Sequence, residues 1–245
     1  MKYTMRHYYP FGRGTNLAGD NLLSPSAWDQ VRMTDNSVNA ALGFYLPEDR
    51  PDWVRVCDES SSAAASAADI AKIVRHGRFT TVLSVGVGRA CLEYHLKRLE
   101  PAVSLVCTEY SPRVVERLRQ VFLECDRIEF LDIKTSAWTD AGPRCLVLLN
   151  RVDTELDDQE WRAVFKNLAA GGVQNILVVA SGFLTPRALA FELRQRMMNI
   201  FFRRRLTFAG YRRTKARFKE LWSPHFTIVE ERSIGALTGF YLAKA

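Results

Sequence analysis

The fold of this chain is decided by the stretch Thr80-Thr81-Val82-Leu83-Ser84-Val85-Gly86-Val87-Gly88-Arg89-Ala90. Its β-branched and aliphatic residues favour a buried strand, and the two glycines permit backbone angles and a close ligand approach that a side chain would obstruct. Apolar residues at helical spacing follow in residues 91–99, so the first amide groups of that helix would face whatever lies over the glycines. The stretch predicts a nucleotide-binding turn for an adenosine-like ligand.

A carboxylate lies at the expected distance beyond this turn. The next predicted strand, residues 102–108, ends in Glu109. An acidic residue about 20 positions after the glycines can accept hydrogen bonds from both hydroxyl groups of a ribose. Two glycines also occur in turns that bind no nucleotide, and a strand-end carboxylate can simply be solvated. The prediction therefore depends on the spacing between the turn and Glu109.

Strand-like and helical patterns alternate along the chain. A helix at 63–76 comes first, followed by the strand and helix of the glycine turn, the strand at 102–108 and a helix beginning with Ser111 and Pro112. Strands near 128–131 and 146–149 come next, and then a helix from the Asp157-x-x-Glu160 capping box to Gly171-Gly172. The last strands are at 175–180, 226–233 and 237–243. Gly235 separates the last two, which read as a hairpin. This order predicts an α/β fold with an open, doubly wound and mostly parallel sheet.

Ligands on such sheets bind at the carboxyl ends of the strands, which places Gly86, Glu109, Asp132 and Asn150 along one edge. Here the chain resembles the class I S-adenosylmethionine-dependent methyltransferases, over about residues 65–185. Four stretches carry the resemblance. Val82–Ala90 looks like the first motif of the family, and Glu109-Tyr110-Ser111-Pro112 looks like the acid, apolar residue and Ser-Pro run after its second strand. Glu129–Ile133 looks like its third strand, and Cys145–Asn150 with Gly171-Gly172 looks like its fourth strand and the Gly-Gly before its fifth.

The resemblance implies a seven-stranded sheet that ends in an antiparallel hairpin, and S-adenosylmethionine as the cofactor. It implies a cofactor site made by Gly86, Gly88, Ala90, Glu109, Tyr110, Asp132, Ile133 and Asn150. In the family, the aspartate after the third strand contacts the adenine amine. Two positions depart from the family pattern: Ser84 stands where an acid is usual, which removes a possible contact to the methionine amino group, and Ala90 stands where a third glycine is usual.

Candidate catalytic residues follow from the chemistry of methyl transfer. Because a sulfonium donor reacts by in-line displacement, the protein mainly has to align the acceptor and exclude water. A hydroxyl acceptor benefits from a base, and Asp153 and Glu155 are placed for this after the fourth strand, with His225 and His7 as further candidates. Each could instead be a packing or surface residue. Residues 150–153 do not match the Asn-Pro-Pro-aromatic motif of amino-methylating nucleic-acid enzymes, which favours oxygen as the acceptor atom.

Composition describes the rest of the chain. The 245 residues suffice for one methyltransferase domain at 59–245, preceded by an aromatic-rich N-terminal extension at 1–58. The extension could cover the acceptor side of the site or bury part of the core. The five scattered cysteines indicate neither a disulfide framework nor a metal site. No signal peptide or membrane-spanning run is evident, so we expect a cytoplasmic protein.

Residues 187–222 form an unusually basic segment, with eleven Lys or Arg against two Glu in a chain whose net charge is +7. We expect a helical insertion here. Its charge could be the solvated side of a helix pair, or an electropositive surface for an anionic acceptor, a nucleic-acid backbone or an anionic membrane. In the second case we expect Arg203, Arg204 and Arg205 to meet the anionic partner, with Phe201 and Phe202 as anchors.

The sequence thus predicts an S-adenosylmethionine-dependent methyltransferase that acts on an oxygen of a small-molecule or glycan-type acceptor, with or without phosphate. One alternative is an RNA methyltransferase that uses the basic segment. Another is an NAD(P)-dependent oxidoreductase, although that class needs Gly-x-Gly-x-x-Gly and residue 91 is Cys. The third is a non-catalytic protein that binds an adenosine ligand or a partner protein, which Ser84 and Ala90 leave open.

Overall fold

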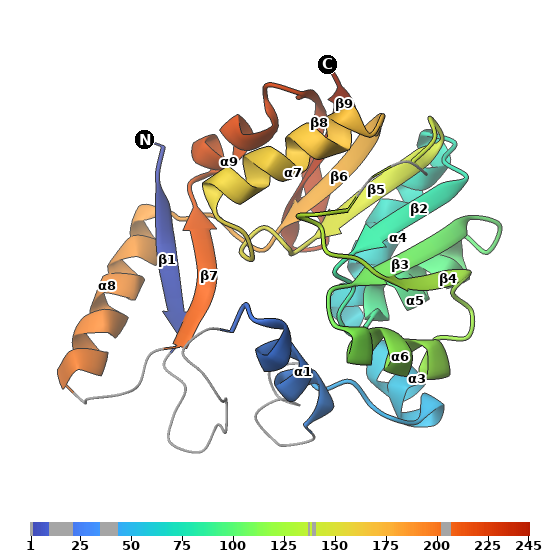
Figure 1. Ribbon diagram of the computed structural model, residues 1–245, viewed down its shortest axis with the longest axis horizontal. Helices are drawn as coiled ribbons and strands as arrows, with labels where there is room; N and C mark the ends of the chain where they lie inside the picture. The colour runs from blue at the N-terminus through green and yellow to red at the C-terminus, as the bar shows by residue number, and fades with distance from the viewer. Residues whose placement is uncertain (1, 10–21, 35–43, 137, 139–140, 202–206) are drawn as a thin grey trace.

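The computed structural model describes residues 2–9, 22–34, 44–136, 138, 141–201 and 207–245 (Figure 1). Its main sheet has seven strands in the order β4-β3-β2-β5-β6-β9-β8. Their bounds are β2 Thr81–Val85, β3 Ser104–Glu109, β4 Arg127–Phe130, β5 Cys145–Asn150, β6 Asn175–Ala180, β8 Phe226–Ile234 and β9 Leu237–Lys244. Neighbouring strands from β4 to β6 pair in parallel, while β9 is antiparallel to both β6 and β8. The predicted α/β fold with a C-terminal antiparallel hairpin is confirmed.

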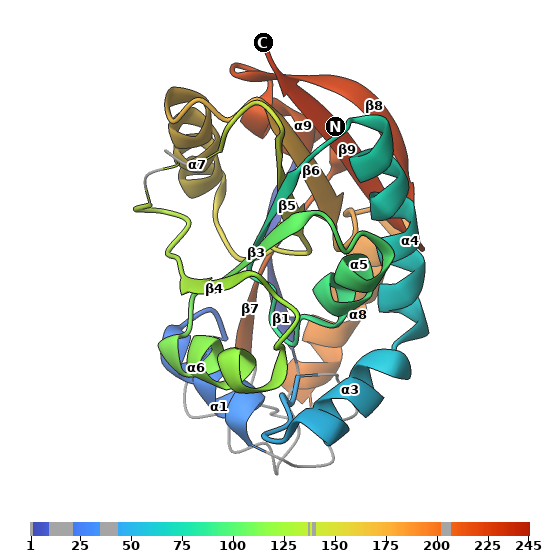
Figure 2. The ribbon, with the colours of Figure 1, turned by 90° about the vertical axis from the view of Figure 1, so that its right-hand side faces the viewer.

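Helices cover both faces of this sheet (Figures 1 and 2). One face carries α3 (Arg50–Asp58), α4 (Ser61–His76), α5 (Cys91–Leu99) and α6 (Pro112–Val121), and the other carries α7 (Asp158–Ala170) and α9 (Lys215–Trp222). Alternate residues of β5 serve the two faces, because Leu146 and Leu148 join the first core while Val147 and Leu149 join the second. No described helix combines the length and the apolar character needed to cross a membrane.

The N-terminal part of the chain packs in two places. In α3, the Trp53 ring is fully buried against Tyr94 and Phe122, with ring centroids 5.2 and 5.1 Å away. The Trp53 indole Nε1 also donates a hydrogen bond of 2.9 Å to the carbonyl of Arg89, in the glycine turn. In contrast, α1 (Pro25–Met33) lies below the carboxyl ends of the strands (Figure 1), and its Met33 packs against the same core as Trp53. One segment of the extension thus supports the turn from behind while another approaches it from the front.

A second sheet pairs β1 (Thr4–Tyr9) with β7 (Thr207–Arg213), and α8 (Pro186–Phe201) lies beside this ribbon (Figure 1). The prediction that residues 187–222 are a helical insertion is therefore corrected, since β7 lies between α8 and α9. The register pairs Thr4 with Arg213. Because its partner strand is at the other end of the chain, the local sequence around 207–213 gave no sign of the pairing.

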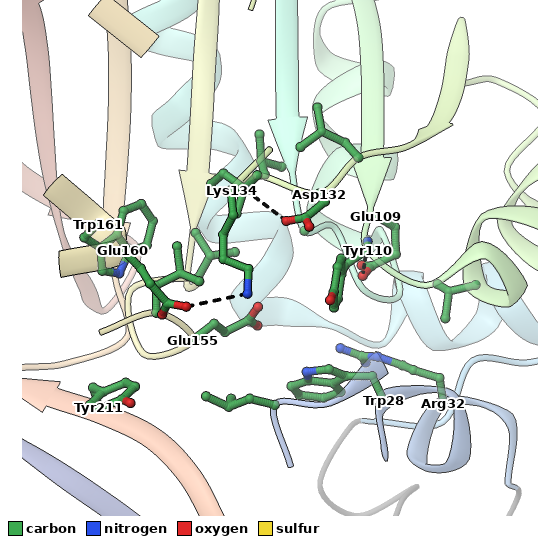
Figure 3. Close-up of a pocket in the computed structure, with 18 of the residues that line it drawn as sticks. Trp28, Arg32, Glu109, Tyr110, Asp132, Lys134, Glu155, Glu160, Trp161 and Tyr211 are labelled. Atoms are coloured by element: carbon green, nitrogen blue, oxygen red, sulfur yellow. Dashed lines mark hydrogen bonds and ion pairs between the residues drawn. The ribbon is translucent and has the colours of Figure 1, made fainter. Parts of the chain in front are cut away.

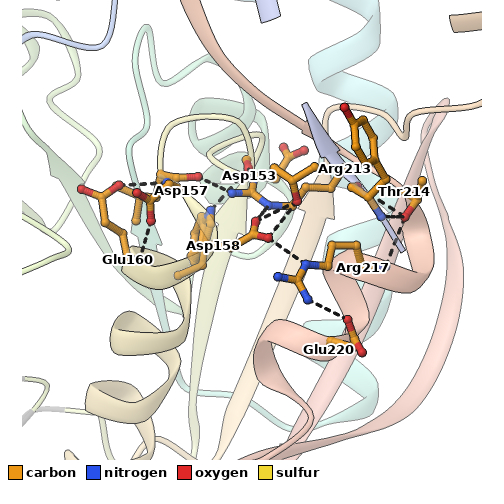
Figure 4. A network of polar contacts seen from close by, with 12 residues as sticks. Asp153, Asp157, Asp158, Glu160, Arg213, Thr214, Arg217 and Glu220 are labelled. Carbon is orange, nitrogen blue, oxygen red and sulfur yellow. Dashed lines mark hydrogen bonds and ion pairs between the residues drawn. The ribbon is translucent and has the colours of Figure 1, made fainter. Parts of the chain in front are cut away.

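A buried arginine of β7 connects this ribbon to the main domain through hydrogen bonds (Figure 4). Arg213 donates hydrogen bonds from Nε to Asp158 Oδ1 (2.6 Å) and from Nη1 to the carbonyl of Asp153 (2.6 Å), and another to the carbonyl of Leu156. Thr4 and Arg217 also donate to the Asp158 carboxylate. Burial alone would raise the pKa of Asp158, but these hydrogen bonds outweigh it and hold the pKa below its ordinary value. The network fixes β7 to the loop that follows β5.

Candidate active site

The glycine turn has the geometry that its sequence predicts. Gly86 and Gly88 both have positive φ angles, +69° and +59°. A Cβ atom on Gly86 would lie 2.7 Å from Val152 Cγ1, and one on Gly88 would lie 2.6 Å from Arg32 Nη2. Ala90 has a φ of 57° in the left-handed region, which explains why a glycine is usual there. The positive φ angles disfavour a side chain at both glycines, and Val152 also leaves little space for one at Gly86. At Gly88 the nearest atoms belong to the end of the flexible Arg32 side chain.

The turn opens into a cavity of about 250 Å³ at the carboxyl edge of the parallel strands (Figure 3). Of the predicted site residues, its lining contains Gly86, Glu109, Tyr110, Asp132, Ile133 and Glu155. The other predicted cofactor residues, Gly88, Ala90 and Asn150, are not part of the lining. Gly88 contributes from behind, because its backbone N–H donates to Glu109 Oε2 over 2.7 Å. The structure thus brings the ends of β2, β3, β4 and β5 together around one space.

Two carboxylates stand at successive strand ends in this cavity (Figure 3). Glu109 is held by two backbone amides, since Oε1 also accepts from the N–H of Tyr110 over 2.8 Å. Asp132 Oδ1 accepts from the N–H of Lys134 over 2.9 Å. A carboxylate has about four lone-pair sites, so both groups keep acceptor capacity for hydroxyl or amine donors. The Lys134 side chain crosses the cavity toward Glu160, with 3.5 Å between Nζ and Oε1.

Residues from distant segments form the other side of the cavity. They are Leu23, Trp28 and Arg32 from the N-terminal part and Phe208 and Tyr211 from β7. The Arg32 guanidinium lies 5.1 Å from the centroid of the Trp28 ring. Burial lowers the pKa of Arg32, and the negative charges of Glu109 and Glu155 partly offset this. The sequence analysis missed all five residues, because an aromatic-rich extension does not reveal which of its residues reach the site.

Glu155 is a titratable group of the cavity whose pKa is strongly perturbed. Burial, followed by the negative charges of Glu109 and Asp153, raises its pKa to about 8, and the positive charge of Arg32 acts in the opposite direction. A carboxyl group with a pKa near neutrality is suited to exchange a proton with a bound molecule.

Comparisons with known proteins give a fold but no close relative. No protein-family model matches the chain, and no curated protein does. Among solved structures, the mitomycin 7-O-methyltransferase MmcR aligns with 92% of this chain and 73% of its own, at 17% identity and a TM-score of 0.57. The S-adenosylmethionine-dependent methyltransferase SibL aligns with 78% of this chain and 56% of its own, at 16% identity and a TM-score of 0.52.

This chain has the class I methyltransferase fold. It spans only 56% of SibL and 58% of the methyltransferase CalO6, which aligns with 68% of this chain at 20% identity and a TM-score of 0.50. The strand order also separates this fold from the dinucleotide-binding one, in which a sixth parallel strand follows the fifth. Here the antiparallel β9 takes that place beside β6.

Two predicted catalytic residues of this methyltransferase fold lie elsewhere. Asp153 is buried, and its Oδ1 accepts from the N–H (2.8 Å) and the hydroxyl (2.7 Å) of Ser181, so it joins the loops after β5 and β6 rather than lining the cavity. His225 precedes β8 beside the amino end of β6, at the sheet edge opposite the cavity. Both side chains therefore lie outside the cavity lining, because position after or before a strand did not reveal the side-chain direction or the strand direction. His7, which belongs to β1, pairs with Glu192 of α8.

A buried acid lies next to Ser84. The Ser84 hydroxyl donates to Glu93 Oε1 over 2.6 Å, and both side chains are buried below the glycine turn of the methyltransferase fold. Burial raises the pKa of Glu93 to about 7, although the hydrogen bond from Ser84 lowers it. The sequence analysis missed Glu93, since acids are common in the first turn of a helix for electrostatic reasons alone.

Acidic residues neutralise much of the basic segment. Its ion pairs include Arg212 with Glu192, Arg213 and Arg217 with Asp158, Arg217 with Glu220, and Lys215 and Lys219 with Glu231. Arg187 and Arg194 of α8 are exposed. Phe202 and Arg203 to Arg205, which the sequence analysis singled out, lie outside the described residues.

Proposed function

We propose that this protein is an S-adenosylmethionine-dependent methyltransferase that methylates an oxygen atom of a small-molecule or glycan-type acceptor. The observation that carries the proposal is the cavity at the glycine turn, where Glu109 and Asp132 stand at successive strand ends and Glu155 faces them. The position of these groups at the carboxyl ends of parallel strands supports the proposal, because such sheets bind ligands there. The solved structures of similar fold that are described above include an O-methyltransferase.

The residues present fit the proposed cofactor. Glu109 would accept the ribose hydroxyls and Asp132 the adenine amine, beside the apolar side chain of Ile133. Arg32, a cation next to Gly88, would pair with the carboxylate of the methionine part. Bound S-adenosylmethionine supplies a methyl group activated by a sulfonium. In this interpretation Ser84 needs no acid of its own, because Glu93 lies behind it.

The acceptor side provides a base and a largely aromatic wall. Glu155 would accept the proton of an acceptor hydroxyl, and its pKa of about 8 suits that role near neutral pH. Trp28, Phe208 and Tyr211 offer flat apolar faces against which a sugar or an aromatic ring can be aligned while water is excluded. Lys134 at the same cavity could pair with a phosphate on the acceptor.

The remaining expectations join this proposal. Residues 1–58 would act as the cover of the acceptor side, through α1, in front of the methyltransferase domain at 59–245. The protein would work in the cytoplasm. An anionic partner of the basic segment would meet Arg187 and Arg194, which are exposed on α8. No described residue gives specific support to the RNA, oxidoreductase or non-catalytic alternatives.

The first test is ligand binding. S-adenosylhomocysteine binds only the folded protein in this proposal, so it should raise the melting temperature by mass action, whereas NAD and NADP should not. Glu109→Ala should weaken S-adenosylhomocysteine binding by about 1.5 to 3 kcal/mol in titration calorimetry, the range for hydrogen bonds to a charged group. Glu116→Ala, at an exposed acid of α6, serves as the control. A stabilisation by NAD alone, or an unchanged dissociation constant in folded Glu109→Ala, would contradict the proposal.

A further inference from the structure

Helix α8 turns its charged side inward. Glu192 is buried against the β1–β7 ribbon, where it pairs with His7 and, over 3.6 Å, with Arg212 Nη1. Arg196 lies on the same side, because its Nη2 donates to the carbonyl of Arg6 over 2.6 Å and its guanidinium lies over the Tyr8 ring. A helix on the surface of a globular protein normally buries its apolar stripe instead.

The opposite side of α8 is apolar and exposed. Five large apolar side chains lie there, with exposed fractions that reach 60% for Met197 and 76% for Phe201: Phe191, Leu193, Met197, Met198 and Phe201. Arg187 and Arg194 are exposed among them. Residues 187, 191, 194, 198 and 201 follow one another at spacings of three or four, so they share one stripe of the helix. We call these seven residues the outer face of α8.

The outer face carries positive charge without any acid. Glu192 is the only acidic residue of α8, and it lies on the inward side. Two copies of the face would bring arginines together in a dimer, which like-charge repulsion disfavours. Phe191 and Phe201 have rings on which the bases of a nucleic acid could stack, but Leu193, Met197 and Met198 have none. A bilayer with anionic lipids suits both the apolar and the basic residues of the outer face. The apolar side chains enter the boundary of the acyl chains, while the arginine guanidinium groups stay at the lipid phosphates.

We propose that the outer face of α8 docks the protein onto the surface of a lipid bilayer that contains anionic lipids. The position of α8 at the periphery of the molecule, on the outside of the β1–β7 ribbon, leaves its outer face free to approach a flat surface (Figure 1). The docking does not depend on the proposed methyl transfer. If that function holds as well, β7 links the two, since Phe208 and Tyr211 belong to the same ribbon and line the cavity.

Co-sedimentation with vesicles tests the docking. The full chain should bind vesicles of phosphatidylcholine with phosphatidylglycerol, bind vesicles of phosphatidylcholine alone much less, and lose binding as salt is added. Arg187→Gln with Arg194→Gln should lower the partition coefficient by about fivefold for each charge removed. Leu193→Ser with Met197→Ser should lower it by roughly tenfold or more, because the apolar contribution is lost. Arg55→Gln with Arg75→Gln, at exposed residues of α3 and α4, makes the same change in net charge elsewhere and should have little effect.

Each variant alters exposed side chains, so its melting temperature should stay close to that of the original chain. The proposal is overturned if the original chain does not bind the anionic vesicles, or if the α8 variants bind as well as it does. A loss of binding in the Arg55→Gln, Arg75→Gln control equal to that in the α8 charge variant would show that only net charge matters, and would also overturn it. Light scattering distinguishes one further outcome: a dimer that dissociates in Leu193→Ser with Met197→Ser would assign the face to a second copy instead.

Discussion

Glu93→Gln isolates the effect of one buried ionisable group on folding. The substitution keeps the shape of the side chain and keeps an oxygen that can accept the 2.6 Å hydrogen bond from the Ser84 hydroxyl. It removes the ability to ionise and replaces the second carboxyl oxygen with an NH2 group, a change that does not depend on pH. Because burial raises the pKa of Glu93 from 4.5 to about 7, the folded protein holds this proton in a pH range where the unfolded chain has released it.

The expected magnitude follows from that difference. An acid whose pKa is raised by folding makes the protein less stable as pH rises, starting at the pKa of the unfolded chain and ending at the pKa of the folded protein. For Glu93 this window runs from 4.5 to about 7. At about 1.4 kcal/mol for each pH unit, the loss over the window amounts to about 3 kcal/mol, to order of magnitude. The Glu93→Gln variant does not suffer this loss, so its advantage should grow from near zero at acidic pH to that value above neutrality.

Urea denaturation of both proteins from about pH 5 to about pH 8 measures the effect. Glu155 also ionises late in the folded protein, but it does so in both proteins and cancels in their difference. Glu116→Gln, at an exposed position of α6, makes the same substitution on the surface and serves as the control. If the Glu93→Gln difference does not change with pH across this range, the reasoning that Glu93 is a buried titrating acid is wrong.

Two further predictions concern the acceptor side. Glu155→Gln should lower kcat and remove the rise of activity with pH that the ionisation of Glu155 produces. S-adenosylhomocysteine should bind to this variant nearly as before. A pH profile that keeps its rise in the variant would exclude Glu155 as the base. Arg213→Met should destabilise the protein by about 3 to 5 kcal/mol in urea denaturation, because it leaves buried carbonyls and Asp158 without their partner. Arg217→Met, which removes a more exposed arginine from the same Asp158, should cost at most about 1 kcal/mol, and equal losses in the two variants would contradict the assigned burial.

Local sequence patterns were sufficient for the core of the fold. The strand predicted at 175–180 is β6, and the helix predicted at 91–99 is α5. The Asp157 and Glu160 capping box forms both of its hydrogen bonds at the start of α7. These features are encoded over a few residues, in the alternation of side chains or in the spacing of a cap. The position of the candidate site followed from the predicted strands, because the carboxyl ends of parallel strands lie at the same edge of a sheet.

The acceptor side could not be predicted in the same way. The strand β7 forms only by pairing with β1, almost the whole chain away, and its own residues mix apolar and basic side chains. The same limit explains the misplacement of His225, because the amino-acid pattern of β8 does not tell from which edge of the sheet the strand enters. Glu93 shows a third limit, because the residue type alone does not tell whether folding buries a carboxyl group or leaves it in solvent.

The two sides of the cavity therefore differ in how firmly the fold holds them. The strand ends that carry Glu109 and Asp132 belong to the main sheet, which is packed between two large cores. Among the described residues, the buried cluster shared by the N-terminal part and β7 consists of Leu22, Val31 and Ala209, with Trp28 and Phe44 packed against it. This cluster is small, so the link of β7 to the rest depends strongly on the polar network of Arg213. Regions with few buried apolar contacts open at lower free energy than a core does. We therefore expect the side of the cavity formed by α1 and β7 to open at lower free energy than the side formed by the strand ends of the main sheet.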